Sequence, residues 1–473
     1  MNNRPSLCLH RGLRSAAKKI AAMKTAAPRC AAAASFFPKF IFALILLPLF
    51  LRLAGNAAAE NLTATNPAPP ANPDWTTASA DPQARLAYPP GRAPQFWSVA
   101  AAETVMARWP DFTKAYFNGW TYVNGYELYG FESLYRATGD PKYFNYLRRY
   151  IDQCVDAAGN FRYVVNARGQ TNRPSFNNLD NMLTGNTLVY LYEVTRDERY
   201  RLAAEKIHRA LADYPRNTDG GFWHNQRMNG QMWIDGVFMG EMFLLRYGKS
   251  IGDRAACWDE VTKQITLFAQ HAERGHSGLY LHAYFEPGHG GSVPGWANKQ
   301  TGLSPEVWSE GLGWYALVVV ETLAELPPEH PGRAAVADIF RRLAAGLQRT
   351  QDVRSGRWFQ VVDRGDRPDN WTDTSGSAMF TYALAKGIEL GLLDKTTFAP
   401  VVANGYRGIT EKARINERGL VDIASACDGL GVQSSYDRYI KFKQSLNAKE
   451  AVAGFLWATT IVEKSQLEKS RHP

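Results

Sequence analysis

Two carboxyl groups stand among glycines and aromatic residues where helical patterns begin. Asp235 lies in the run QMWIDGVFM, shortly after a GGFWH motif that ends at His224, and Asp180 lies in NNLDN. Indole rings around a carboxyl group remove water, which raises its pKa and lets it donate a proton near neutral pH. The pattern favours acid–base chemistry, with Asp235 as the principal group and Asp180 as its partner.

Helix capping is the alternative interpretation for both residues. An aspartate in the first turn of a helix commonly accepts backbone N–H bonds and complements the positive helix end. That explanation is good for either residue alone. Because Asp180 and Asp235 hold equivalent places in consecutive helical units, a pair of carboxylates across one cavity is favoured, as acid–base work on sugars requires.

Aromatic and histidine side chains surround these carboxyl groups in the sequence. A single histidine is more often structural, but His224 and His282 both follow Gly-rich aromatic motifs, which favours hydrogen bonding to a substrate. Tryptophans are often core residues, but in Gly-rich loops their flat faces suit stacking on sugar rings. The predicted substrate-binding residues are His224, His282, Trp223, Trp233, Met239, Trp308, Glu310, Trp314 and Tyr122.

Several other kinds of chemistry lack their sequence signatures. No HExxH or similarly close ligand spacing is present, so no metal is expected. Phosphate loops, nucleophile elbows and dinucleotide-binding fingerprints are also absent, so no cofactor is expected.

Positive charge is concentrated at the start of the chain. The formal net charge is +9, but nine Lys and Arg residues and no Asp or Glu precede Glu60. The remainder is close to neutral, which removes the support for a nucleic-acid partner. Residues 1–59 combine a basic start, an apolar core over 40–53 and a small-residue site at Ala57–Ala59, which predicts a secretory signal from Met1 or Met23. A periplasmic or secreted location is expected, with no membrane span after cleavage because the apolar core is short.

The segment after this signal also has a distinct composition. Residues 60–95 are rich in Ala, Pro, Thr and Asn, which indicates a flexible or surface-hugging leader. Cleavage would leave Cys154, Cys257 and Cys427, enough for at most one disulfide.

Residues 96–470 are predicted to form one all-α catalytic domain of six helical hairpins. The repeated unit is an aromatic helix start, a short turn and a second amphipathic helix, and two of the turns, TGDPKY and TRDERY, nearly copy each other. The units begin at Tyr122, Asp180, Trp233, Trp308, Thr374 and Lys449. A hairpin buries its apolar face against its neighbours, so six predict an (α/α)6 barrel, with an open helical solenoid as the alternative. A closed ring is favoured because it would bring the unusual residues to one mouth.

A set of motifs in this order, GGFWH, QMWIDGVFM, GLYLHAYF, SPEVWSEGLGWYAL and GRWFQVVD, resembles the unsaturated rhamnogalacturonyl hydrolases of glycoside hydrolase family 105. These are related to the unsaturated glucuronyl hydrolases of family 88. The resemblance covers about residues 120–457 and implies an (α/α)6 barrel. It also implies removal of a 4,5-unsaturated uronic acid from the non-reducing end of lyase-generated oligosaccharides.

The resemblance also implies roles for individual residues. Asp235 would protonate C4 and help water add at C5, after which the hemiketal opens and expels the rest of the sugar. Asp180 would orient the ring or poise Asp235, and His224 and His282 would line the uronate pocket. Many family members have Arg in RGNGW where this chain has Glu310 in EGLGW, which removes an obvious partner for an anionic substrate. The loop cations Arg227 and Lys299 are candidates to supply the charge.

The sequence thus predicts a monomeric, cofactor-free glycoside hydrolase acting on oligosaccharides with an unsaturated uronate from an acidic polysaccharide such as rhamnogalacturonan. Another (α/α)6 enzyme, such as an ordinary glycosidase, a lyase or an epimerase, is one alternative. A non-catalytic sugar-binding protein is the other.

Overall fold

A computed structural model describes residues 80–117, 119–290 and 292–471. The predicted signal, residues 1–59, lies outside these ranges, and so do residues 60–79 of the predicted leader. The helices are α1 (Trp97–Arg108), α2 (Tyr122–Thr138), α3 (Pro141–Cys154), α4 (Gly185–Thr195), α5 (Glu198–Ala212), α6 (Ile234–Ser250), α7 (Arg254–Ala272), α8 (Ser309–Glu325), α9 (Arg333–Thr350), α10 (Thr374–Glu389), α11 (Lys395–Thr410), α12 (Tyr436–Ile440) and α13 (Lys449–Lys469), with 3-10 turns η1 (Phe112–Phe117) and η2 (Leu179–Asn181). Four two-stranded antiparallel sheets pair β1 (Val164–Val165) with β2 (Thr171–Asn172), β3 (Gln231–Trp233) with β4 (Ala283–Phe285), β5 (Trp358–Phe359) with β6 (Thr372–Asp373), and β7 (Ala413–Ile415) with β8 (Val421–Ile423).

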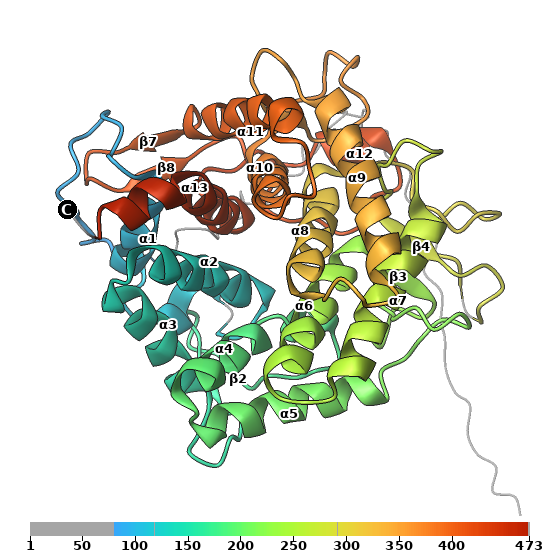
Figure 1. The fold of residues 1–473 in the computed structure, drawn as a ribbon, viewed down its shortest axis with the longest axis horizontal. Helices are drawn as coiled ribbons and strands as arrows, with labels where there is room; N and C mark the ends of the chain where they lie inside the picture. Colours follow the sequence, from blue (N-terminus) through green and yellow to red (C-terminus); the bar gives the residue numbers. More distant parts are fainter. Residues whose placement is uncertain (1–79, 118, 291, 472–473) are drawn as a thin grey trace, which may run out of the picture. The chain divides into compact units, whose positions relative to one another are not determined.

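The helices form two concentric rings (Figure 1). Helices α2, α4, α6, α8, α10 and α13 line the inside, each packed against its neighbours, and α13 contacts both α10 and α2. An outer helix covers each inner one. The ring is therefore closed, which confirms the predicted (α/α)6 barrel and excludes the open solenoid.

The sixth pair differs from a consecutive hairpin. Helix α13 packs against α1, which comes from the other end of the described chain. The carboxylate of Glu463 on α13 accepts the backbone N–H groups of Trp97 and Ser98 at 2.9 and 3.0 Å. It thereby satisfies N–H groups that the first turn of a helix leaves free. The barrel is closed by joining its two ends, not by a sixth local turn.

The two similar turns, TGDPKY and TRDERY, each contain an aspartate that caps the following helix. Asp140 accepts the N–H of Lys142 at 3.0 Å before α3, and Asp197 accepts the N–H of Arg199 at 3.1 Å before α5. Each aspartate is the N-cap of the outer helix that follows it. Gly139, with φ +69°, ends α2 in the left-handed conformation that glycine adopts most readily.

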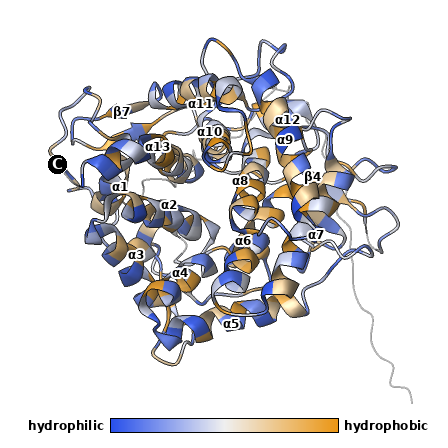
Figure 2. Ribbon diagram, in the orientation of Figure 1, coloured by the Kyte–Doolittle hydropathy of each residue, from blue (hydrophilic) through white to orange (hydrophobic). Residues whose placement is uncertain are grey.

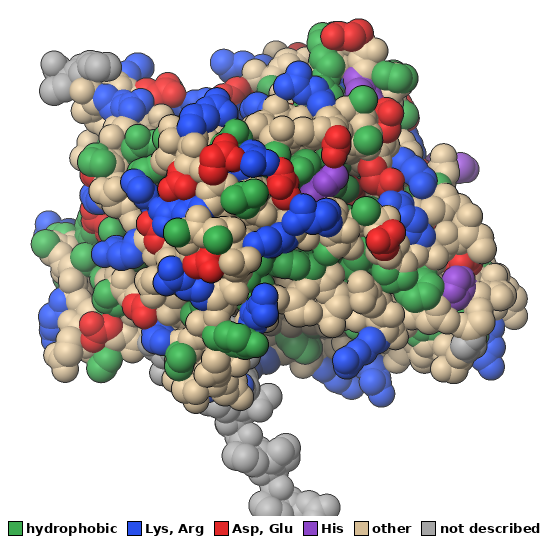
Figure 3. All heavy atoms as spheres, turned by 90° about the horizontal axis from the view of Figure 1, so that it is seen from below, with side chains coloured by type: hydrophobic (Ala, Val, Ile, Leu, Met, Phe, Trp, Pro, Cys, Tyr) green, Lys and Arg blue, Asp and Glu red, His purple; other side chains and the backbone are tan. Residues whose placement is uncertain are grey.

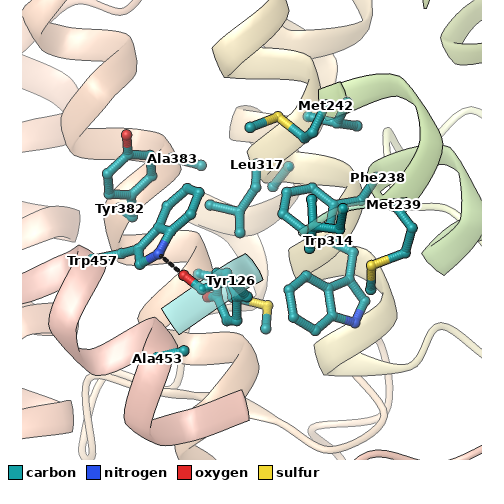
Figure 4. Close-up of a cluster of buried hydrophobic side chains, with 14 of the residues drawn as sticks. Tyr126, Phe238, Met239, Met242, Trp314, Leu317, Tyr382, Ala383, Ala453 and Trp457 are labelled. Carbon is teal, nitrogen blue, oxygen red and sulfur yellow. Dashed lines mark hydrogen bonds between the residues drawn. The ribbon is translucent and has the colours of Figure 1, made fainter. Parts of the chain in front are cut away.

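Inner helices such as α6 and α8 are predominantly hydrophobic, whereas outer helices such as α5 have separate hydrophilic and hydrophobic faces (Figure 2). On α8 every residue from Ser309 to Leu323 is buried. Aromatic side chains fill the middle of the barrel, among them Tyr126, Phe238, Trp314 and Trp457 (Figure 4). The indole N–H of Trp457 donates to the Tyr126 carbonyl at 2.8 Å. The barrel interior is thus a packed core, and space for a ligand is left only towards its ends.

The rest of the described chain surrounds this core. Within residues 80–95, Leu86 N–H donates to the Arg418 carbonyl and Gly91 N–H to that of Ile415, both at 2.9 Å, so this part of the predicted leader is held against the barrel. All three cysteines after residue 60 are buried and unpaired. Acidic and basic side chains are interspersed over the face in Figure 3, as expected for a domain whose net charge is close to zero. None of the helices in the described ranges has the length and apolar content needed to cross a bilayer.

Candidate active site

A cavity of about 250 Å³ opens where the inner helices begin. Nine of the eleven candidate residues line it, namely Tyr122, Asp180, His224, Trp233, Asp235, Met239, Trp308, Glu310 and Trp314. Its other lining residues are Gly429, Leu430, Gly431 and Lys449. The ring brings these residues together from five of the inner helices, α2, α4, α6, α8 and α13, and from the loops before them.

The short sheet β3–β4 sets Asp235 beside His282. Trp233 in β3 pairs with Ala283 in β4, and the N–H of Ile234 donates to the His282 carbonyl at 2.9 Å. The next residue, Asp235, therefore begins α6 directly against the histidine. The Nε2 atom of His282 lies 3.1 Å from Oδ2 of Asp235.

The other side of His282 fixes its hydrogen-bonding role. Its Nδ1 lies 2.9 Å from the Tyr439 hydroxyl, which accepts the backbone N–H of Gln433 at 3.2 Å. The tyrosine can therefore donate its own hydrogen to Nδ1, which leaves the Nε2–H of His282 to donate to Asp235. His282 is fully buried and lies behind Asp235, so it is a positioning residue and not part of the cavity wall.

Asp235 does not cap its helix. The N-cap of α6 is Trp233, which makes no side-chain cap hydrogen bond. The Asp235 carboxylate faces His282 on one side, and 14% of its side-chain surface is exposed. A carboxyl group held at one oxygen and open at the cavity can exchange a proton with a bound molecule.

Asp180 is presented by a different backbone from the one expected. The helix was predicted to begin at Asp180, but α4 begins at Gly185, and Asp180 lies in the 3-10 turn η2. This segment is tightened by bonds from Met182 N–H to the Leu179 carbonyl and from Gly185 N–H to the Met182 carbonyl, both at 2.9 Å. Asn178 caps the turn and also donates to Oδ2 of Asp180 at 3.2 Å.

The charge of Asp235 acts on the neighbouring Asp180. Burial raises the pKa of Asp180, and the charge of Asp235 raises it further, while His224 acts in the opposite direction. His224 Nε2 lies 3.6 Å from Oδ1 of Asp180, and its ring stacks on that of Trp233 at 4.5 Å between centroids. This stacked pair of rings, called the ring wall below, lines the cavity together with both carboxyl groups.

The glycine after Asp235 allows this close approach. A Cβ atom at Gly236 would lie 3.0 Å from the Leu179 side chain and 3.1 Å from His224 Nδ1. Contacts that short are rarely tolerated in a packed interior. The glycine of the WIDG motif lets the Asp180 turn lie directly against α6.

Trp223 and the two loop cations lie elsewhere. Trp223 does not line the cavity, because its indole N–H donates to Asn217 at 3.0 Å and its ring edge meets His289. Arg227 and Lys299 are exposed, and neither is a lining residue. The cavity's cation is instead Lys449, the first residue of the last inner helix. Lys449 is not among the residues predicted from the sequence, although it starts an inner helix, the same signal that identified Asp235.

Nothing in the described ranges indicates a metal site, since no three His, Cys, Asp or Glu side chains there are grouped to hold an ion. The cavity offers carboxyl groups, hydroxyl groups, stacked rings and one ammonium group. Such a set suits proton transfer to a polar ligand with an apolar ring face.

Comparisons with known proteins agree with this architecture. Residues 97–466 match the family described as Glycosyl Hydrolase Family 88. Protein Atu3128 of Agrobacterium fabrum is 36% identical over 155 residues, which are 33% of this chain and 63% of that relative's length. The unsaturated rhamnogalacturonyl hydrolase YesR of Bacillus subtilis is 26% identical over 272 residues, 56% of this chain and 70% of the relative.

A solved structure extends the match over the whole barrel. A family 105 glycoside hydrolase of C. acetobutylicum is 29% identical, with a TM-score of 0.70, and the alignment covers 78% of this chain and 99% of that one. The resemblance to families 105 and 88 that the motifs indicated is therefore confirmed.

Proposed function

Because the chain belongs to glycosyl hydrolase family 88, we propose that it is a hydrolase that removes a 4,5-unsaturated uronic acid from the non-reducing end of short oligosaccharides. Two comparisons support this activity: the relative from Bacillus subtilis is named an unsaturated rhamnogalacturonyl hydrolase, and the structural match belongs to family 105. Lyase-generated fragments of rhamnogalacturonan or a related acidic polysaccharide are the substrate class.

The observation that carries the proposal is the environment of Asp235. One oxygen of its carboxyl group is held by His282 at 3.1 Å, and its side chain lines the cavity next to Asp180 and the ring of Trp233. The carboxyl group can deliver a proton to a substrate atom bound in the cavity against the rings of Trp233 and His224. The Nε2–H of His282 can then stabilise the carboxylate that remains.

The reaction needs a single acid–base residue. Asp235 donates its proton to C4 of the substrate's C4=C5 bond, and positive charge develops at C5 and the ring oxygen. The carboxylate of Asp235 then takes a proton from the water that adds at C5. The resulting hemiketal opens at the ring oxygen, which leaves a hemiacetal at C1 that expels the remaining sugar as an alcohol. Water is consumed, and Asp235 ends in its starting protonation state.

Asp180 and the ring wall orient the substrate in this scheme. Asp180 lies close enough to Asp235 for their charges to interact, and His224 contacts it at 3.6 Å. A carboxyl group with a raised pKa can donate a hydrogen bond to a sugar hydroxyl while protonated. The stacked pair of Trp233 and His224 offers a flat surface for the sugar ring.

The setting of the enzyme is part of the same proposal. The basic, then apolar, then small-residue pattern of residues 1–59 supports export to the periplasm or the exterior, where polysaccharide fragments are met. We take the enzyme to act there as a monomer.

The test is the Asp235→Asn variant, assayed by loss of the ultraviolet absorbance of the unsaturated uronate. Losing the proton donor should lower kcat by at least about 100-fold, while circular dichroism shows the same helical fold. The matched control is Asp213→Asn, at the exposed end of α5, which should keep wild-type activity.

The same assay separates the alternative functions. An ordinary glycosidase would cleave the saturated oligosaccharide, a lyase would increase the absorbance, and a binding protein would turn over neither substrate. Near-normal turnover by Asp235→Asn would remove this residue from the reaction.

A further inference from the structure

The cavity carries a concentration of acidic groups that an anionic substrate must overcome. Asp180, Asp235 and Glu310 line it, and Glu450 lies directly behind the wall, where the Tyr122 hydroxyl donates to its Oε1. Among the described residues that line the cavity, one is a cation, Lys449. A second negative charge brought into such a site is repelled unless a cation or a hydrogen-bond donor receives it.

Lys449 is placed to receive a charge from the cavity. Its Nζ bonds to Glu450 Oε1 at 2.8 Å and to Asp428 Oδ1 at 3.2 Å, and 19% of its side chain remains exposed. Burial lowers the pKa of Lys449, but the charges of Glu450 and Asp428 outweigh this effect and raise the pKa above the usual lysine value, so the group stays charged. Lys449 Nζ also lies 3.2 Å from the Asp428 backbone carbonyl. A ligand carboxylate would therefore share or replace one of the two longer contacts to Asp428.

The glycine loop beside it keeps the ammonium group accessible. A Cβ atom at Gly429 would lie 2.8 Å from Glu450 Oε1 and 3.3 Å from Lys449 Nζ, and the residue has φ +64°. Any other side chain would therefore be strained and would crowd the lysine. Gly429 lines the cavity together with Lys449, so the opening leads to the ammonium group.

Glu310 lines the same cavity as Lys449. It is 1% exposed and accepts the Ser375 hydroxyl at 2.8 Å. Burial raises the pKa of Glu310 well above its usual value, and the carboxyl groups of Glu450 and Asp373 raise it further, while Lys449 and Ser375 act in the opposite direction. A protonated carboxyl group carries one O–H donor.

We infer that Lys449 binds the carboxylate of the substrate's uronic acid and that Glu310, as a neutral acid, donates a second hydrogen bond to it. This inference rests on the proposed function and names the residues that make the enzyme specific for an anionic sugar. It explains how a site with Glu310 in the place of an arginine accepts a uronate: the positive charge comes from the start of α13 instead of the start of α8.

The test compares an unsaturated disaccharide with its methyl ester, whose carboxyl group is uncharged. For Lys449→Met, loss of a charged hydrogen-bond partner should raise KM for the free acid about 10- to 100-fold, with a much smaller change in kcat. The KM for the ester should stay within about threefold of wild type. Lys449→Arg should recover most of the affinity. Glu310→Met, which removes the donor, should raise KM for the acid about 3- to 10-fold, and Glu310→Gln, which restores an N–H donor, should recover most of that loss.

Exposed cations provide the matched controls. Arg227→Met and Lys299→Met alter lysine or arginine side chains that do not line the cavity, and both should bind the acid as wild type does. Equal losses for acid and ester in Lys449→Met, or an unchanged KM for the acid in Glu310→Met, would overturn the inference. If wild type releases no uronate from any unsaturated substrate, the proposed function itself fails, which is a different outcome.

Discussion

Replacing His282 by alanine is expected to slow the reaction while leaving the barrel folded. The residue touches no cavity surface, so a purely structural view predicts a loss of stability without a specific effect on turnover. The hydrogen-bond chain from Tyr439 through His282 to Asp235, with links of 2.9 and 3.1 Å, predicts a catalytic effect instead.

The magnitude follows from the kind of bond that is lost. A hydrogen bond to a charged group contributes about 1.5–3 kcal/mol, which corresponds to roughly 10- to 150-fold in rate. The bond from His282 is strongest when Asp235 is a carboxylate, which is the state reached after protonation of C4. The loss should therefore fall mainly on kcat and only weakly on KM.

Three variants separate positioning from packing. His282→Gln retains an N–H donor and should recover part of the rate that His282→Ala loses. Tyr439→Phe removes only the outer link and should cost less than His282→Ala. The control is His208→Gln. His208 also contacts a tyrosine, Tyr247, but it lies on the outer helix α5, so this variant should leave kcat unchanged.

The measurement is the absorbance assay on variants whose helical circular dichroism and melting temperature are recorded in parallel. If His282→Ala is folded and turns over at the wild-type rate, the donor role of His282 is refuted. If kcat falls equally in His282→Gln and His282→Ala, the volume of the ring matters and its N–H does not.

Two predictions concern stability. Burial raises the pKa of Glu127 from 4.5 to about 8, so between these values the folded state holds a proton that the unfolded state has released. The unfolding free energy should fall by about 1.4 kcal/mol for each pH unit as the pH rises through this window, and Glu127→Gln should remove that slope in urea denaturation. At Gly125 a Cβ atom would lie 2.6 Å from Thr184 Cα, so Gly125→Ala should cost about 1–3 kcal/mol in the same assay. Gly252→Ala, with open space around it, should cost nothing; an equal loss at both glycines would contradict the packing argument.

Much of the barrel could be predicted because its signals are local. The N-caps Asp140 and Asp197, with the turns around them, mark helix ends through bonds to residues two positions away. The hairpins then follow from helical periodicity. What this reasoning missed was the pairing of α1 with α13, because residues more than 300 positions apart leave no periodic signal in the sequence.

The candidate site was predictable in its position and less so in its contacts. Nine of eleven candidates line one cavity because they lie in the first two turns of an inner helix or in the loop before it. Trp223 had the same kind of surroundings in the sequence, but a single bond to Asn217 accompanies its turn away from the cavity. Lys449 was overlooked because a lysine at a helix start resembles an ordinary solvated residue.

The amino-acid sequence determined the helical repeats, their caps and the residue types that a proton-transferring sugar site needs, since all of these depend on neighbours a few positions away. Only the tertiary structure decided that His282 supports Asp235 from behind, that Asp180 comes from a 3-10 turn, and that Lys449 is the cation of the cavity. Those relations join segments tens to hundreds of residues apart, and their distances are set by how the ring closes and how closely its glycines let backbones approach.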